Sequence, residues 1–372
     1  MTKKIDSQKV MLDHSEAKVK LLGKYLDRYL NIIANDGYTK KINIFDLFCG
    51  EGLYENGGKG SPIIILENVK KLHSINSGRI DKIPSIDIFF NDIKKEKTDK
   101  VDSIVKQKGL HSERFGQLYY RNKNYKEIIP SLSAFLDKSK DAKSFIFIDP
   151  YGYKEIRASE IKGLLKSKKS EVLLFLPTQF MYRFDEKGTP ESLIELLDDL
   201  VEYNKWKSNE SVFHFIDQFK EAFKQNLGSE FFVDTFTIQK DKHTVFCLFF
   251  FSSHIRGFEK MLEAKWDIDT EAGKGWKYER TRSLFEPFKT NLLESNLLKK
   301  LANSAMNNVE IYNFTLHSGF LPKHMNEVLN TLQETNKISV TLKTGEKARK
   351  NAFYVNYDHY KNNEDKVLIK LC

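Results

Sequence analysis

The feature that most constrains the fold of this chain is a repeated alternation of short apolar segments with longer charged segments of helical periodicity. These apolar segments have about the length of a strand, and most of them are rich in Ile, Leu, Val and Phe. Strands that alternate with helices form a parallel sheet covered by helices on both faces. The sequence therefore predicts a doubly wound α/β fold, with strands at residues 42–48, 86–90, 118–120, 145–148 and 172–176.

The segments that flank these strands refine the predicted fold. Residues 14–34 carry apolar side chains at helical spacing and predict an amphipathic helix that covers the sheet, and residues 178–227 form an aromatic-rich helical insertion. Two apolar runs, 231–238 and 244–251, are separated by five polar residues and predict a hairpin. A terminal antiparallel strand added to a parallel sheet is the arrangement that class I methyltransferases share. The sequence thus favours a Rossmann-like methyltransferase sheet over a plain nucleotide-binding domain.

The last 80 or so residues predict a second, small domain. Helical periodicity followed by two short strands around a basic loop is typical of a winged helix-turn-helix. We therefore expect residues 1–290 to form the methyltransferase-like domain and residues 291–372 to form the winged helix. The predicted helices are 292–302, 309–316 and 322–335, and the predicted wing consists of strands 338–342 and 352–357 joined by the loop 343–351.

Charge and apolar content limit the partners. Lys and Arg outnumber Asp and Glu by 60 to 51, which gives a formal charge of +9 and favours phosphate-rich partners. No segment is apolar over the ~18 residues that a membrane span requires, and the lysines after Met1 are not followed by an apolar stretch, so no secretory signal and no membrane association are expected. The sequence predicts a cytoplasmic protein. Cys49, Cys247 and Cys372 are too scattered for a metal site or a disulfide framework.

A glycine loop follows the first predicted strand. The string Asp46-Leu47-Phe48-Cys49-Gly50-Glu51-Gly52 matches motif I of amino-directed nucleic-acid methyltransferases. Glycines let the backbone pass close to a ligand, and an acid at the strand end can accept a hydrogen bond from an ammonium group. We expect Asp46, Phe48, Gly50 and Gly52 to bind S-adenosylmethionine, although a bare Gly-x-Gly could also be an ordinary tight turn.

Two later positions are candidates for the same cofactor. Asp92 follows the second strand, where an acidic side chain would meet the ribose hydroxyls, and the alternative is that it caps a helix. Asn124 follows the third strand, where methyltransferases contact the adenine. Both are predicted cofactor-binding residues.

Asp149-Pro150-Tyr151-Gly152 closes the fourth strand and is the predicted catalytic motif. In N6-adenine methyltransferases a related Asp-Pro-Pro-Tyr holds the target amine through the Asp while the aromatic ring stacks on the flipped base. The second Pro is absent here, and the form Asp-Pro-Tyr-Gly looks like the motif of tRNA guanine-N2 methyltransferases. The alternative is an Asx-type turn after a strand.

Other candidates are open to a structural interpretation. His14 and Lys18 could reach the cofactor, but a solvated helix face is the expected role of both. Phe180, Tyr182 and Arg183 lie at the rim where a base would enter, or they are packing residues. Basic residues around the wing are predicted phosphate contacts, with a merely charged hairpin as the alternative: Lys323, Lys343, Lys347, Arg349 and Lys350.

Taken together, these motifs resemble the three-Cys-motif partner (TcmP) proteins of bacteria and phages, which are encoded beside radical-SAM-like three-Cys-motif proteins. The resemblance implies a methyltransferase-like domain, a C-terminal winged helix and a three-Cys-motif protein as partner. The residues that carry it are His14-x-x-x-Lys18 with Lys24-Tyr25-Leu26, the loop 46–52, Gly60-Ser61-Pro62, the motif 149–152, Gly257-Phe258-Glu259-Lys260-Met261 and Gly319-Phe320-Leu321-Pro322-Lys323-His324.

Two functions are compatible with these observations. The first is transfer of a methyl group from S-adenosylmethionine to an exocyclic amine of a base in RNA or DNA. The second is a nucleic-acid-binding adaptor that keeps the fold but has little or no activity and serves a partner protein, with phage defence as one setting. The presence of both Asp46 and Asp149, at the two ends of one site, favours the enzyme.

Overall fold

The computed structural model describes residues 11–78, 83–139, 141–185, 190–202, 206, 209–278 and 290–372. The chain divides into two compact units, the first made of Met1–Gly257 with Lys274–Glu279 and the second of Phe258–Gly273 with Arg280–Cys372. Within the described ranges, no helix has the length and apolar character needed to cross a membrane.

The sequence predicted a single domain boundary at residue 290. The observed division differs, because the segment Phe258–Gly273 belongs to the C-terminal unit. The reason is the packing of Trp266 inside that unit. Its indole N–H donates to the Gly319 carbonyl at 3.0 Å, and its ring lies 5.7 Å from that of Phe320. A large buried aromatic side chain contributes strongly to a core, so this segment is an integral part of the second unit.

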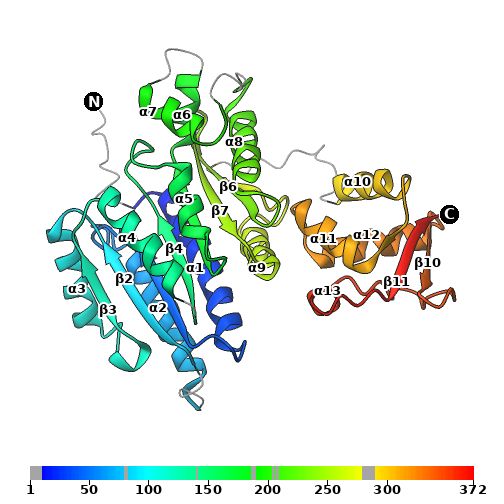
Figure 1. Cartoon of the computed structure of the whole chain (residues 1–372), viewed down its shortest axis with the longest axis horizontal. Helices are drawn as coiled ribbons and strands as arrows, with labels where there is room; N and C mark the ends of the chain where they lie inside the picture. The colour runs from blue at the N-terminus through cyan, green and yellow to red at the C-terminus, as the bar shows by residue number, and fades with distance from the viewer. Residues whose placement is uncertain are drawn as a thin grey trace. The chain divides into compact units, whose positions relative to one another are not determined.

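The first unit is built on an eight-stranded sheet in which neighbouring strands β3, β2, β1, β4 and β5 are parallel and β7 is antiparallel to β5 (Figure 1). The predicted doubly wound α/β fold with a terminal antiparallel strand is confirmed. In sheet order the strands are β3 (Leu118–Arg121), β2 (Ser85–Asn91), β1 (Lys41–Asp46), β4 (Ala142–Ile148), β5 (Ser170–Leu176), β7 (Thr244–Ser252), β6 (Phe232–Asp241) and β8 (Gly275–Lys277).

Helices cover both faces of this sheet, because alternate side chains of each buried strand point to opposite faces. In β4, Phe145 packs against Tyr25 of α1 at 5.6 Å, whereas its neighbour Ile146 joins the core formed with α4 and α5. Figure 1 shows α4 and α5 on one side of the strands and α1 and α2 on the other. These helices are α1 (Asp13–Ala34), α2 (Ser61–Ile75), α4 (Tyr125–Lys138) and α5 (Ala158–Leu165), and α3 (Lys95–Lys108) follows β2.

The aromatic-rich region after β5 contains helices that extend the same core. Phe219 packs against Phe215 at 5.7 Å, against Phe223 at 5.1 Å and against Phe249 of β7 at 5.5 Å. This cluster fixes the last helix of the region on the sheet. The helices are α6 (Thr178–Asp185), α7 (Glu191–Asp198) and α8 (Val212–Leu227), and α9 (Ile255–Trp266) follows β7.

A buried carboxyl group fixes α1 on the sheet. Glu171 of β5 accepts hydrogen bonds from the hydroxyl of Tyr25 and, at 2.7 Å, from that of Ser252. Burial raises the pKa of Glu171, and the two hydroxyl groups partly offset that effect. Gly257 lies directly against this group, because a Cβ there would be 2.0 Å from Oε1 of Glu171. Since Lys18 precedes Tyr25 by two helical turns, this anchor also determines where Lys18 lies.

The second unit contains the predicted winged helix, but its wing is built differently from the prediction. Strand β10 (Ile338–Leu342) pairs antiparallel with β11 (Val367–Leu371), which in turn pairs with β9 (Met306–Asn307). The segment 352–357, predicted as the second wing strand, is not a strand. Its Tyr354 has a φ of +55°, a left-handed conformation that interrupts extended pairing. The helices are α10 (Asn291–Leu301), α11 (Asn308–His317), α12 (Pro322–Glu334) and α13 (Tyr357–Lys361).

Candidate functional site

Three acidic side chains meet at the carboxyl edge of the parallel strands. Asp46 is the last residue of β1, Asp92 follows β2 directly and Asp149 follows β4 directly. The register places Asp46 opposite Phe90 of β2 and opposite Phe147 of β4. In open α/β sheets, ligands bind outside this edge, where strand order reverses. The structure thus brings together the acids that the sequence assigned to one site.

Asp46 is fully buried, and neither of its carboxylate oxygens makes a hydrogen bond of good geometry to any described residue. Burial raises its pKa to about 7, and the nearby charge of Asp149 adds to the rise, whereas the Ser61 hydroxyl, the Phe48 N–H and Lys18 oppose it. Ser61 is the first residue of α2, directly after the cap residue Gly60. A buried carboxylate without well-formed hydrogen bonds is costly, so Asp46 has the character of a ligand-binding group.

The glycine loop leaves open space beside these acids. Gly50 and Gly52 have φ values of +64° and +81°, in the region that favours glycine. A Cβ built on Gly50 would find no described heavy atom within 4 Å beyond its chain neighbours. The loop is held by the Gly50 N–H, which donates to Asp92 at 3.2 Å, and by the Cys49 N–H, which donates to the Asn91 carbonyl at 2.8 Å.

Asn91, the last residue of β2, is a site residue that the sequence analysis did not identify. Its amide N–H groups donate to the carbonyls of Leu47 and Lys123, each at 3.1 Å, and its oxygen accepts from the Lys123 N–H at 3.1 Å. One buried side chain therefore connects the loops after β1 and β3. An Asn at the end of a central strand, beside an acid, was the available signal.

Asp92 is buried and already holds a cation. Its carboxylate accepts from the Lys94 N–H at 3.0 Å and forms an ion pair with Lys97 at 3.3 Å. Lys97, which the sequence analysis missed, is buried and also donates to the hydroxyl of Tyr151, with its ammonium 4.6 Å from the centre of that ring. Burial alone would lower the pKa of Lys97, but Tyr151 and Asp92 outweigh it and raise the pKa. Lys97 thus links the predicted ribose-binding acid to the predicted base-stacking ring.

Asp149 also holds a cation, and here the sequence prediction was wrong. Lys18 was expected on a solvated helix face, but it is buried, forms an ion pair with Asp149 and lies 4.6 Å from the centre of the Phe175 ring. His14 is buried too and stacks on Phe246 at 5.4 Å. Burial, Lys240 and Lys18 lower the pKa of His14 to about 4, so this ring is neutral at pH 7.

The remaining predicted cofactor residues, Phe48 and Asn124, have local structural contacts. Asn124 caps α4, and its side-chain oxygen accepts from the Lys126 N–H at 2.9 Å. Phe48 stacks on Tyr125 at 5.4 Å. Contact of Asn124 with an adenine stays a prediction, and its cap fixes the loop in which it lies.

Two aromatic side chains are exposed at the same edge. Tyr151 is 64% exposed and Phe180, at the start of α6, is 48% exposed. Phe180 is supported from behind by Phe184 at 4.9 Å. By contrast, Arg183 donates to the His243 carbonyl at 3.0 Å, which ties it to the β6–β7 hairpin. The rim therefore offers flat apolar surfaces at the edge where Asp149 lies.

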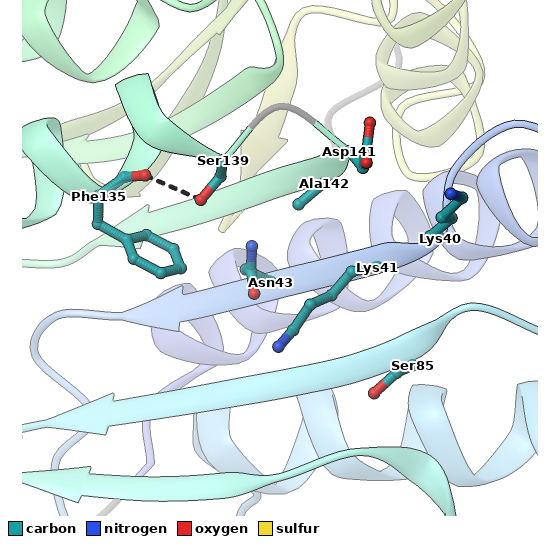
Figure 2. Close-up of a pocket in the computed structure, with 8 residues that line it drawn as sticks. All are labelled: Lys40, Lys41, Asn43, Ser85, Phe135, Ser139, Asp141 and Ala142. Atoms are coloured by element: carbon teal, nitrogen blue, oxygen red, sulfur yellow. Dashed lines mark hydrogen bonds between the residues drawn. The ribbon is translucent and has the colours of Figure 1, made fainter.

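A shallow pocket lies at the opposite, amino-terminal ends of the parallel strands (Figure 2). Among its lining residues are Lys41, Ser85 and Ala142, the first residues of β1, β2 and β4. Lys41 forms an ion pair with Asp87 at 2.7 Å. This pocket is separated from the three acids by the length of the strands, so it is distinct from the candidate site.

The basic residues of the wing are exposed, and some of them are paired. Lys343 lies 3.8 Å from Asp365, and Lys350 lies 3.1 Å from Glu334. Lys347 and Arg349 form no ion pair with the residues that the structure describes. The loop that carries them folds back onto β10, where the Ala348 N–H donates to the Val340 carbonyl at 2.9 Å. Lys323 is exposed at the start of α12.

A comparison with protein families supports a winged helix in the C-terminal part of the chain. Residues 266–345 match the family model described as a GMT-like wHTH domain, and a comparison with curated proteins found no match. The winged-helix prediction is therefore confirmed. Because the match covers only the C-terminal part, the resemblance to three-Cys-motif partner proteins stays a prediction.

Solved structures with a similar fold include several that are described as methyltransferases or methylases. The O-methyltransferase from Bacillus cereus, in complex with SAH, is 12% identical, covers 67% of this chain and 93% of its own, and gives a TM-score of 0.34. Trm1 from Pyrococcus horikoshii, in complex with S-adenosyl-L-methionine, is 12% identical. The match covers 82% of this chain and 76% of Trm1, with a TM-score of 0.36. An rRNA methylase from Streptococcus thermophilus is 7% identical. The match covers 62% of this chain and 93% of the methylase, with a TM-score of 0.30. At this level of identity the likeness is one of fold alone.

The buried Asp46 carboxyl group predicts a specific pH dependence of stability. Its pKa rises from 3.8 to about 7 on folding, so the folded protein keeps this proton to higher pH than the unfolded chain does. The stability of the wild type relative to Asp46→Asn should therefore fall as the pH rises through this interval, by up to about 1.4 kcal/mol per pH unit, and level off above it. Thermal unfolding midpoints of both proteins across this range test the prediction, and a constant difference would contradict it.

Proposed function

We propose that this chain is an S-adenosylmethionine-dependent methyltransferase that acts on an exocyclic amine of a nucleic-acid base. The single observation that carries the proposal is the buried Asp46 carboxylate, whose oxygens make no hydrogen bond of good geometry to a described residue, at the same strand edge as the open space at Gly50. A cofactor that combines an ammonium group with a nucleoside would satisfy the acid and fill the space. The confirmed methyltransferase-type sheet supports the same assignment.

The residues at the edge of the sheet fit this cofactor. Asp46 would accept from the cofactor's ammonium group, and the backbone at Gly50 and Gly52 would pass beneath it. Asp92 would accept from ribose hydroxyls, and since Lys97 now occupies one of its oxygens at 3.3 Å, we expect Lys97 to move or share that oxygen. Phe48 and Asn124 would border the adenine.

Asp149 is the residue to which we assign alignment of the substrate amine. Its carboxylate would accept an N–H hydrogen bond and so direct the nitrogen lone pair at the methyl group, an effect realised mainly in the transition state. When bound, S-adenosylmethionine supplies a methyl group whose C–S bond breaks as the lone pair forms the N–C bond, which leaves S-adenosylhomocysteine. The amine then loses one proton, which passes to water. Pro150 and Gly152 shape the turn, and Tyr151 offers a ring for stacking.

The second unit supplies the nucleic-acid contacts in this proposal. A winged helix binds nucleic acid through a helix and the wing, and exposed cations near the wing suit phosphate groups. We assign phosphate contacts to Lys323, Lys343, Lys347, Arg349 and Lys350. The chain's charge of +9 supports such a partner.

A specific observation also favours the adaptor function. Asp92 and Asp149 are each paired with a buried lysine, so two of the three acids are already neutralised without a ligand. An adaptor could keep these pairs as structural elements and use the winged helix alone, with a three-Cys-motif protein as the partner that the sequence resemblance implies. Methyl transfer distinguishes the two functions.

Replacement of Asp149 tests the enzymatic proposal. In an assay of methyl transfer from labelled S-adenosylmethionine into total bacterial RNA and DNA, Asp149→Asn should lower kcat by about 10²- to 10⁴-fold, with cofactor affinity nearly unchanged. The matched control is Asp141→Asn, an exposed acid near the other end of the same strand, which should behave as wild type. Incorporation unaffected by Asp149→Asn would refute the assigned role, and tight cofactor binding without any incorporation would favour the adaptor.

Charge reversal on the wing tests the nucleic-acid contacts. The double variant Lys347→Glu/Arg349→Glu should weaken binding to nucleic acid and flatten its dependence on salt, because fewer counterions are released. The control Lys299→Glu/Lys300→Glu makes the same charge change on the exposed end of α10. Fluorescence anisotropy across a salt series provides both affinity and slope. An equal loss in both variants would mean that the contact is general attraction rather than a wing interface.

A further inference from the structure

The ammonium group of Lys18 occupies a defined position in the candidate site. It is bonded to Oδ2 of Asp149 on one side and faces the Phe175 ring on another, and Lys18 as a residue is 8% exposed. Burial alone would lower the pKa of Lys18, but its interactions with Asp149 and, to a smaller extent, with Tyr54 outweigh that effect and raise the pKa. Lys18 is therefore a permanent hydrogen-bond donor beside the proposed acceptor for the substrate amine.

Asp149 keeps an acceptor for the substrate even with Lys18 bound. Lys18 uses Oδ2, and Oδ1 accepts no hydrogen bond from the described residues. The Asp149 side chain is 20% exposed and that of Lys18 is 10% exposed, so both charged groups keep some access to solvent and to a ligand. The site thus presents an acceptor and a donor side by side.

The bases differ in what lies next to their amine. On the Watson–Crick edges of adenine and cytosine, the amine neighbours a ring nitrogen that accepts a hydrogen bond. In guanine, the amine neighbours a ring N–H on that edge, which would face the Lys18 ammonium donor against donor. The other neighbour of the guanine amine is a ring-nitrogen acceptor, but it lies on the glycosidic side of the base. Contact of that nitrogen with Lys18 would therefore bring the attached ribose close to a side chain that is buried among protein atoms.

The aromatic residues at the rim cannot make this distinction. Tyr151 and Phe180 are exposed and offer flat surfaces, but every base has a face that can stack on them. Discrimination between bases comes from hydrogen bonds to their edges, because a mismatched buried polar group is left without a partner. Lys18 with Asp149 is the polar pair placed next to the rim.

We propose that Lys18 is the specificity-determining residue of the site. Asp149 accepts a hydrogen bond from the exocyclic amine of the base, and the Lys18 ammonium donates one to the ring nitrogen next to that amine. The target base is therefore adenine or cytosine rather than guanine. This inference rests on the proposed methyl transfer. It identifies the substrate as a base in which an exocyclic amine adjoins a ring-nitrogen acceptor. It also assigns to α1, which lies outside the glycine and Asp-Pro motifs, a direct part in substrate recognition.

The first experiment identifies the product. Total bacterial RNA and DNA treated with the full-length protein and labelled S-adenosylmethionine are digested to nucleosides and separated by mass spectrometry. Label in methyladenosine or methylcytidine, at the exocyclic nitrogen, is the expected result and distinguishes the two bases. Label in N2-methylguanosine would overturn this inference and leave the proposed methyltransferase function standing. No labelled nucleoside at all would overturn both.

The second experiment measures binding and does not depend on turnover. With S-adenosylhomocysteine present, the protein's affinity is measured for two single-stranded oligonucleotides. One carries the unmodified target base identified in the first experiment. In the other, the ring-nitrogen acceptor of that base is replaced by C–H, as in 1-deazaadenine or 3-deazacytosine. A hydrogen bond to a charged donor is worth about 1.5–3 kcal/mol, so wild type should bind the deaza oligonucleotide about 10- to 150-fold more weakly.

Variants of α1 assign that difference to Lys18. Lys18→Met should bind the two oligonucleotides with similar affinity, while Lys20→Met, an exposed lysine on the same helix, should keep the wild-type ratio. A merely structural role of Lys18 would weaken binding of both oligonucleotides and leave their ratio unchanged, which would overturn the inference. Affinity for S-adenosylhomocysteine alone shows whether each variant is folded.

Discussion

The candidate site depends on the parallel pairing of β1 with both β2 and β4. Because these strands run in the same direction, the residues that end them come to one edge, although Asp46, Asp92 and Asp149 are widely separated in the sequence. The helices on both faces bury the strands and make any charge near their ends costly to leave unbalanced. Whether each acid at this edge is paired with a cation therefore indicates which charged group a ligand would have to supply.

The three acids are balanced in different ways. Asp149 is paired with Lys18 and Asp92 with Lys97, whereas Asp46 forms no ion pair with a described residue, and burial raises its pKa. A site that stabilises two of its carboxylates internally and leaves the third for a ligand is suited to a molecule with one ammonium group. The open space at Gly50 lies in the loop that directly follows Asp46, at the same edge. Charge and shape thus favour the same cofactor.

Much of the fold and part of the site could be predicted from the sequence. The strands and the terminal hairpin are dictated by local apolar patterns, and the meeting of Asp46, Asp92 and Asp149 follows from parallel topology alone. The burial of Lys18 was missed because a charged residue on an amphipathic helix is normally solvated, although its spacing from Tyr25 places both on the buried face. The second wing strand was missed because the chain between β10 and β11 contains its own buried residues, Phe353 and Val355, which imitate a strand. In both cases the deciding contact is with a distant part of the sequence: Lys18 pairs with Asp149, and β10 pairs with β11.

The central claim, that Asp46 receives the cofactor's ammonium group, is tested most directly by proton release on binding. At pH 6 a carboxyl group with a pKa of about 7 is mostly protonated, and contact with a cation would ionise it. Titration calorimetry of S-adenosylmethionine in buffers of different ionisation enthalpy should therefore show release of close to one proton per molecule bound by wild type and almost none by Asp46→Asn. Binding with no buffer dependence, or with the same proton release in both proteins, would contradict the account.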